Sequence, residues 1–193
     1  MNNEKKLFPV SVIVPMRNVS TTIVPALESL ISQDYPIKEI IVIDNVSVDS
    51  SIKIVQNFEE NKKEIPIRLV KHKKNIGVGG SYNEGVKMAK TDYVVFMHSD
   101  SILPSRNELK KLMEPIAKDP NVIASASIML HPREIWEKYN FWQKCLFART
   151  VGIKTSGLNG KFDCYKRDVF LSIGGYYVIH YGHHIGIGSE DAD

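Results

Sequence analysis

The sequence predicts an α/β fold built on a mostly parallel β-sheet with helices on its faces. Three observations lead to this prediction. The apolar runs are unbroken, as in residues 40–43, Ile-Ile-Val-Ile, and strands of parallel sheets have this composition because both faces are covered. Segments with apolar residues at helical spacing separate these runs, which is typical of βαβ units. Polar residues follow directly after three of the runs, where such sheets bind their ligands.

The expected strands are short apolar runs. Residues 10–14 are a mainly β-branched run after Pro9, and residues 39–44 leave no polar face. Residues 67–71, 93–97 and 122–129 are the third, fourth and fifth expected strands, and residues 161–166 are a further candidate.

The expected helices lie between these runs, over residues 21–33, 50–60, 81–89 and 104–118. Each has an apolar stripe: in the last, it is formed by Leu109, Leu112, Met113 and Ile116. Pro25 is tolerated in the first turn of its helix, because the amide there has no partner in the helix. A short helix after residue 166 is expected to end at residues 174–175, which are both glycine.

The pattern changes after residue 130. Apolar and aromatic residues then recur at helical spacing: Ile135, Trp136, Tyr139, Trp142, Leu146 and Phe147. We expect a helix that packs on the sheet, with a membrane or acceptor surface as the alternative. Residues 157–160 and 176–188 are expected to form loops.

Composition describes a globular protein of 193 residues with a net charge of +3. This charge is too small to indicate a nucleic-acid partner, although it tolerates an anionic ligand. No apolar run is long enough to span a membrane, and the N-terminus has no apolar core of a signal peptide. Cys145 and Cys164 are far apart, so we expect reduced thiols and a cytoplasmic location.

Three strand ends carry the candidate site: residues 15–18 after the first strand, Asp44 after the second, and residues 98–100 after the fourth. Asp44 follows the second strand, where residues 45–49 are typical of a turn that caps the next helix, and Asp44 is a candidate acceptor for a base or ribose. Asp100 follows the fourth strand, where a carboxylate is a good ligand for Mg²⁺ or Mn²⁺. His98 is a nitrogen ligand, a ribose contact or only a strand-end residue.

Residues 75–80 contain glycines and lie between the third strand and its helix. Gly77 and Gly79 match the start of a dinucleotide fingerprint, but Tyr82 stands where its last glycine is needed, which argues against an NAD-linked oxidoreductase. A glycine loop under a nucleotide fits the pattern. The lysines at positions 71, 73 and 74 are expected to be solvated, with phosphate contact as the alternative.

Two further groups near the C-terminus are candidates. His180, His183 and His184 could contribute one metal ligand, although histidines in a loop are more often solvated. Glu190 and Asp191 are, taken alone, good charges for a helix N-terminus.

Together these segments resemble family 2 of the glycosyltransferases, which have the GT-A fold with a Rossmann-like N-terminal half. The resemblance rests on five stretches in order, from about residue 9 to 193: VSVIVPMRN, EIIVIDNVSVDSS, NIGVGGSYNEGVKMAKTDYVVFMHSDSIL, GKFDCYKRDVFLSIGGYY and GSEDAD. It implies one catalytic domain over residues 1–193, with a nucleotide-binding half at about 9–103 and an acceptor-side half at about 104–193.

The resemblance also implies an activity. A family member moves a sugar from a nucleotide-diphosphate sugar, here expected to be a UDP-sugar, to an acceptor hydroxyl with inversion. Asp191 corresponds to the general base, Glu190 contacts the acceptor, and Asp100 corresponds to the last acid of the D-x-D motif and holds Mn²⁺ or Mg²⁺. The residues expected around the donor nucleotide are Pro15, Asn18, Asp44, Asn45, Gly77, Asn83 and Ser99.

The chain departs from the family pattern at three places. His98 stands where the first acid of D-x-D is usual, so metal binding depends more heavily on Asp100. Tyr82 replaces an arginine that is frequent in the family. The chain ends at the base motif, which suggests a truncated protein whose absent region would bind a sugar or lipid-linked acceptor and contact the inner face of the membrane. A non-catalytic nucleotide-sugar-binding module is the alternative reading.

Overall fold

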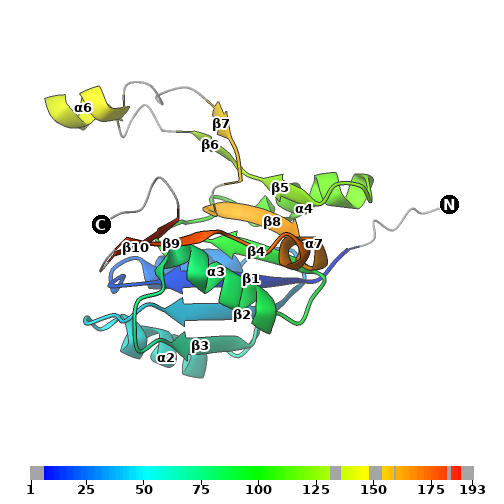
Figure 1. Ribbon diagram of the computed structural model, residues 1–193, viewed down its shortest axis with the longest axis horizontal. Coiled ribbons are helices and arrows are strands. Elements are labelled where there is room, and N and C mark those ends of the chain that lie inside the picture. The colour runs from blue at the N-terminus through cyan, green and yellow to red at the C-terminus, as the bar shows by residue number, and fades with distance from the viewer. Residues whose placement is uncertain (1–6, 131–135, 148–153, 159, 182–183, 188–193) are drawn as a thin grey trace.

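The computed structural model describes residues 7–130, 136–147, 154–158, 160–181 and 184–187. Its centre is a six-stranded sheet in the order β3-β2-β1-β4-β8-β5 (Figure 1). The first four of these strands run parallel, and β8 is antiparallel to both β4 and β5. The strands are β1 (Val10–Met16), β2 (Ile37–Asp44), β3 (Ile67–Lys71), β4 (Tyr93–Met97), β5 (Ala124–Ala126) and β8 (Phe162–Lys166). The α/β prediction with a mostly parallel sheet is therefore confirmed.

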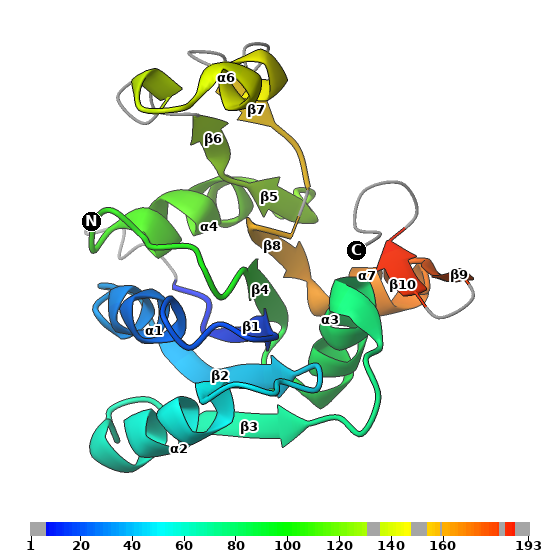
Figure 2. The same ribbon diagram turned by 90° about the vertical axis from the view of Figure 1, so that its left-hand side faces the viewer.

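Helices cover both faces of the sheet (Figure 2). Three helices pack on one face with the larger apolar core, and they are α1 (Ile23–Ile31), α2 (Ser51–Asn61) and α4 (Glu108–Lys118). Two others cover the opposite face, and they are α3 (Gly77–Met88) and α7 (Arg167–Ser172). Strands β1, β2 and β4 are buried between the two layers, which explains why their sequences have no polar face. Pro25 is the third residue of α1 and so lies in its first turn, as expected.

Two expected elements differ in the structure. The run at residues 122–129 is divided: β5 joins the main sheet, whereas β6 (Ile128–Leu130) pairs with β7 (Lys154–Ser156) in a separate two-stranded sheet. Residues 176–188, expected as a loop, contain an antiparallel pair of strands, β9 (Val178–Tyr181) and β10 (His184–Ile187). Strands this short form only because they pair with another strand, which is distant in the sequence or lies across a turn. Their own composition therefore predicts them poorly.

The aromatic segment after residue 130 does not cover the sheet. Helix α6 (Phe141–Phe147) lies beyond β6 and β7, apart from the main sheet in both views (Figures 1 and 2). Phe141 is 70% exposed and Trp142 is 75% exposed. The expectation that this helix packs on the sheet is therefore wrong for Trp142. Together with Phe141, which was not part of the expected apolar face, Trp142 forms an exposed aromatic pair.

Candidate functional site

The carboxyl ends of β1, β2 and β4 meet at one edge of the sheet. The three strands are neighbours and run parallel, and their register pairs Met16 with Asp44 and Ile13 with Phe96. The amide of Asn45 donates to the carbonyl oxygen of Met16 at 2.9 Å, so the ladder continues into the loop after β2. The three polar segments that the sequence singled out are thus brought to the same edge.

The loops after β1 and β2 are tied to each other by side chains. The amide of Asn18 donates to Ser47 Oγ at 3.0 Å, and Asn18 Oδ1 accepts from the amide of Val48 at 2.8 Å. Asn18 has a positive φ of 54°, a conformation that asparagine adopts more readily than most residues. The side-chain oxygen of Asn18 therefore holds the loop together, and its expected contact with a donor base stays a prediction.

Asp49 strengthens the same junction. One of its carboxylate oxygens accepts from the hydroxyl and the amide of Ser51, at 2.5 and 3.0 Å, and the other accepts from the amide of Ser20 at 3.1 Å. These hydrogen bonds, those from Ser51 first, lower the pKa of Asp49 to about 2. The loops after β1 and β2 are therefore linked by an ionised carboxylate at neutral pH.

Asp44 is almost completely buried. Its residue surface is 1% exposed, and its two carboxylate oxygens lie 3.3 and 3.1 Å from the amide of Ser47. The expected turn after β2 is therefore present. Pro15, which precedes the last residue of β1, is also buried. The contact of either residue with a nucleotide stays a prediction.

Asn45 is the centre of a polar cluster beside Asp44. Its amide nitrogen donates to Ser81 Oγ at 2.7 Å and to the carbonyl oxygen of Gly77 at 3.3 Å. Its oxygen lies 3.0 Å from Nδ1 of His72. Sequence reasoning did not single out His72, because a lone histidine among lysines has no distinguishing pattern, and only the spatial neighbours reveal its role.

Asn83 and Tyr82 make contacts within the protein. Asn83 donates to the carbonyl oxygen of Tyr176 and accepts from its amide, both at 2.8 Å. Tyr82 is fully buried, and its hydroxyl donates to the carbonyl oxygen of Gly160 at 2.5 Å. Tyr82, which stands at the position of the family arginine, is thus part of the core. The expected donor contact of Asn83 stays a prediction.

His98, Ser99 and Asp100 follow β4 directly. His98 Nδ1 and Asp100 Oδ1 are 4.0 Å apart, the Asp100 side chain is 67% exposed, and that of His98 is 27% exposed. Two ligands of one small divalent cation can be no more than about 4.2 Å apart, given metal–ligand bonds of about 2.1 Å. At 4.0 Å the pair could share an ion only if that ion lay nearly on the line between the two atoms, so shared ligation stays a prediction. The exposure of Asp100 leaves room for phosphate oxygens and water around its carboxylate. Ser99 is buried beside them.

The remaining candidates lie partly or wholly outside the described residues. Glu190, Asp191 and His183 are outside them. His180 and His184 belong to the backbone of β9 and β10, respectively. The roles predicted for these five residues stay predictions.

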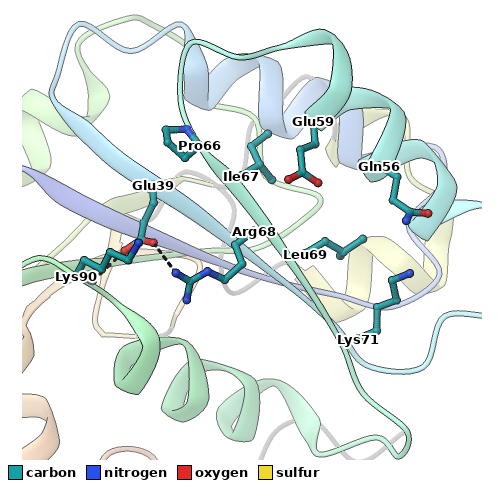
Figure 3. A pocket seen from close by; sticks show the side chains of 9 residues that line it. All are labelled: Glu39, Gln56, Glu59, Pro66, Ile67, Arg68, Leu69, Lys71 and Lys90. Atoms are coloured by element: carbon teal, nitrogen blue, oxygen red, sulfur yellow. Dashed lines mark hydrogen bonds and ion pairs between the residues drawn. The ribbon is translucent and has the colours of Figure 1, made fainter.

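A hollow of about 450 Å³ lies along the edge strand β3, and Figure 3 shows its lining. Its buried carboxylate, Glu39, accepts from the hydroxyl of Ser11 at 3.0 Å and from the amide of Lys90 at 2.9 Å, and it pairs with Arg68 at 3.6 Å. Glu39 is thus held by three partners near the start of β2, at the opposite end of the strand from Asp44. We therefore place the candidate site at the carboxyl ends of β1, β2 and β4 and treat Glu39 as a structural carboxylate.

Comparison with known sequences supports the family resemblance. The family model described as Glycosyl transferase family 2 matches residues 11–172. The uncharacterized glycosyltransferase YibD of Escherichia coli K12 is 36% identical over 100 residues, which are 52% of this chain and 27% of that protein. The O-antigen chain rhamnosyltransferase WbaN of Salmonella anatum is 27% identical over 150 residues, 72% of this chain and 45% of that protein. The chain thus spans less than half the length of these relatives.

Solved structures share the fold. A mannosyltransferase from Pyrobaculum calidifontis, in complex with GDP-Man and Mn²⁺, superimposes with a TM-score of 0.71 at 24% identity, covering 89% of this chain and 48% of that chain. TarS from Staphylococcus aureus, in complex with UDP-GlcNAc, gives a TM-score of 0.63 at 18% identity, covering 88% and 48%. The expected GT-A fold is confirmed. No helix among the described residues has the length and apolar character needed to cross a lipid bilayer.

Proposed function

Because the chain belongs to glycosyl transferase family 2, we propose that it moves a sugar from a UDP-sugar to an acceptor hydroxyl, with inversion at the anomeric carbon. The observation that carries this proposal is the meeting of three polar strand ends at one edge of the sheet, with the exposed carboxylate of Asp100 among them. Ligands of open α/β sheets bind in this position. We also propose that residues 1–193 form a single catalytic domain, with the nucleotide half at about 9–103 and the acceptor side at about 104–193.

The donor nucleotide lies against the ends of β1 and β2 in this proposal. The loops that carry Asn18 and Asn45 are held in place before any ligand binds, by the hydrogen bonds among Asn18, Ser47 and Val48. A preformed pocket loses less conformational entropy on binding than a mobile one. The residues proposed to contact the nucleotide are Pro15, Asn18, Asp44, Asn45, Gly77, Asn83 and Ser99.

Asp100 would hold the diphosphate end of the donor through a divalent cation, with His98 as a second candidate ligand. A bound Mn²⁺ or Mg²⁺ would neutralise the negative charge that builds on the departing diphosphate. Support comes from the exposure of the carboxylate. The mannosyltransferase with the same fold was solved with Mn²⁺, which is consistent with this assignment.

Asp191 is the general base in the proposed reaction. It removes the proton from the acceptor hydroxyl, whose oxygen attacks the anomeric carbon from the face opposite the diphosphate, and Glu190 contacts the acceptor. A positioned base accelerates such a step by about 10²–10⁴-fold. Replacing Asp191→Asn should therefore abolish sugar transfer and leave donor binding unchanged. Transfer that survives this substitution would show that another group is the base.

The acceptor is proposed to be a lipid-linked hydroxyl at the inner face of the membrane. Support comes from the exposed aromatic pair Phe141 and Trp142 on α6 and from Lys144 in the same helix. Exposed aromatic rings beside lysines are typical of segments that lie in a membrane interface.

A second candidate function is a nucleotide-sugar-binding module without transferase activity. The observation that favours it is His98, which stands where the family usually has an acid and therefore weakens the case for a tightly held cation. Calorimetry distinguishes the two functions. Donor binding that requires Mn²⁺ supports the transferase, and donor binding that ignores Mn²⁺ supports the module.

A further inference from the structure

The ring of His72 bridges two elements beside the candidate nucleotide pocket. It follows β3, its side chain is only 11% exposed, and its Nε2 lies 2.8 Å from Oε2 of Glu84 on α3. Its Nδ1 lies 3.0 Å from Oδ1 of Asn45, at the end of β2. The imidazole thus connects the end of β2 to the third helix.

The partners of Asn45 determine which end of its amide faces His72. One amide partner is the carbonyl oxygen of Gly77, which can only accept a hydrogen bond, so the NH₂ group must point there. The other end lies 3.4 Å from the amide nitrogen of Ile76, which can only donate. The oxygen of Asn45 therefore faces His72, and the opposite orientation of the amide would lose both contacts.

Each ring nitrogen of His72 consequently faces an acceptor: the oxygen of Asn45 on one side and the carboxylate of Glu84 on the other. A neutral imidazole has a single N–H, so it can satisfy only one of them. Both contacts exist together only when the ring carries two hydrogens and a positive charge. Other charged groups nearby are Asp44 at the end of β2 and, in the same segment, Lys71 and Lys73.

We propose that His72 is a positioning residue for the nucleotide site and that its protonation makes donor binding sensitive to pH. In its charged form the ring fixes Asn45, which in turn holds Ile76 and Gly77 at the start of α3. Loss of one hydrogen breaks one of the two contacts and loosens the junction between β2 and α3. This inference rests on the proposed function.

The test measures the affinity for UDP-GlcNAc, UDP-glucose and GDP-mannose by calorimetry in the presence of Mn²⁺ between pH 5.5 and 8.5, for the wild-type chain and for His72→Gln. The two phosphates of these donors are diesters and do not titrate in this range. We expect the wild-type affinity to fall by about tenfold as the pH rises, the effect of losing one charge-assisted hydrogen bond. The His72→Gln variant should bind more weakly at pH 6 and should not show this fall in affinity.

Two further variants exclude trivial explanations. Lys87→Gln removes an exposed positive charge from α3, away from the cluster, and should keep the wild-type profile. Glu84→Gln keeps the side-chain shape but removes the negative charge, so its affinity should begin to fall at a lower pH than in the wild type. It also serves as the test if His72→Gln fails to fold.

The outcomes separate the two claims. Parallel pH profiles in the wild type and in His72→Gln, or an unchanged profile in Glu84→Gln, would overturn the role of His72 while leaving the proposed function intact. A wild-type chain that binds none of the three donors at any pH would overturn the proposed function, and this inference with it. The ¹⁵N spectrum of the His72 ring gives an independent readout, and we expect both nitrogens to be protonated under the conditions in which the donor binds most tightly.

Discussion

At the scale of single residues, the chain separates side chains that hold the site from side chains that are free to bind. Asn45 has partners at both ends of its amide, and Asn83 is paired with the backbone of Tyr176. Asp100, by contrast, is mostly exposed at the end of β4. Residues at motif positions therefore do not all present free polar groups, and several of them tie neighbouring segments of the chain together.

The loop at Gly160 packs closely against the buried ring of Tyr82. Gly160 has a φ of 77°, and a Cβ added there would lie 2.9 Å from Cε2 of the buried Tyr82. Gly174 also has a positive φ, 86°, but a Cβ there would meet nothing within 4 Å. We expect Gly174→Ala to cost about 1 kcal/mol of unfolding free energy and Gly160→Ala about 1–2 kcal/mol more. Equal losses in urea denaturation would contradict the tight packing of Tyr82 on Gly160.

The hydrogen bonds of Asp49 lead to a prediction about how the stability of the fold depends on pH. Its pKa is about 2 in the folded chain and near 3.8 when unperturbed, so the folded state is stabilised by the ionised form. This contribution is complete above about pH 4 and is lost as the pH falls toward 2. Asp49→Asn should therefore lower the melting temperature at pH 7, and the difference from the wild type should shrink between pH 4 and 2. A difference that does not change with pH would show that the charge of Asp49 is unimportant.

At the scale of elements, the sequence predicted best what depends on local pattern. The buried strands β1, β2 and β4 were found because both of their faces are apolar, and α4 because its stripe is regular. Helix α3 begins at Gly77, four residues before its expected start, because glycines there obscured the pattern. The β9–β10 pair and the position of α6 depend on contacts that no local pattern records. For the same reason, the bridging role of His72 became visible only in three dimensions.

Helix α6 leads to a prediction about membrane contact. Replacing both Phe141→Ser and Trp142→Ser should reduce binding to vesicles of anionic phospholipid by at least about fivefold, because these exposed rings would otherwise enter the interface. The melting temperature should hardly change, because exposed side chains contribute little to stability. Ile173→Ser is the matched control, since Ile173 is similarly exposed near α7. Vesicle binding that is unchanged in the double variant would exclude α6 as the contact.

At the scale of the whole molecule, the fold gathers distant parts of the chain at one edge. Segments near residues 15, 44 and 98 are separated by about 29 to 54 positions, and the parallel order of β2, β1 and β4 brings their ends together. The carbonyl oxygen of Lys161, the residue before β8, also lies there and accepts a 3.2 Å hydrogen bond from the amide of His98. The central claim is that this edge binds a nucleotide-diphosphate sugar through a cation held by Asp100.

Calorimetry with UDP-GlcNAc, UDP-glucose and GDP-mannose, with and without Mn²⁺, tests that claim most directly when it compares the wild-type chain with Asp100→Asn. Asp168→Asn is the control, because it removes an exposed carboxylate from α7, which is not one of the proposed site segments. We predict that Mn²⁺ tightens binding of at least one donor by about tenfold or more, and that this gain is lost in Asp100→Asn but kept in Asp168→Asn. A gain from Mn²⁺ that survives in Asp100→Asn, or wild-type binding that is indifferent to Mn²⁺, would contradict the account.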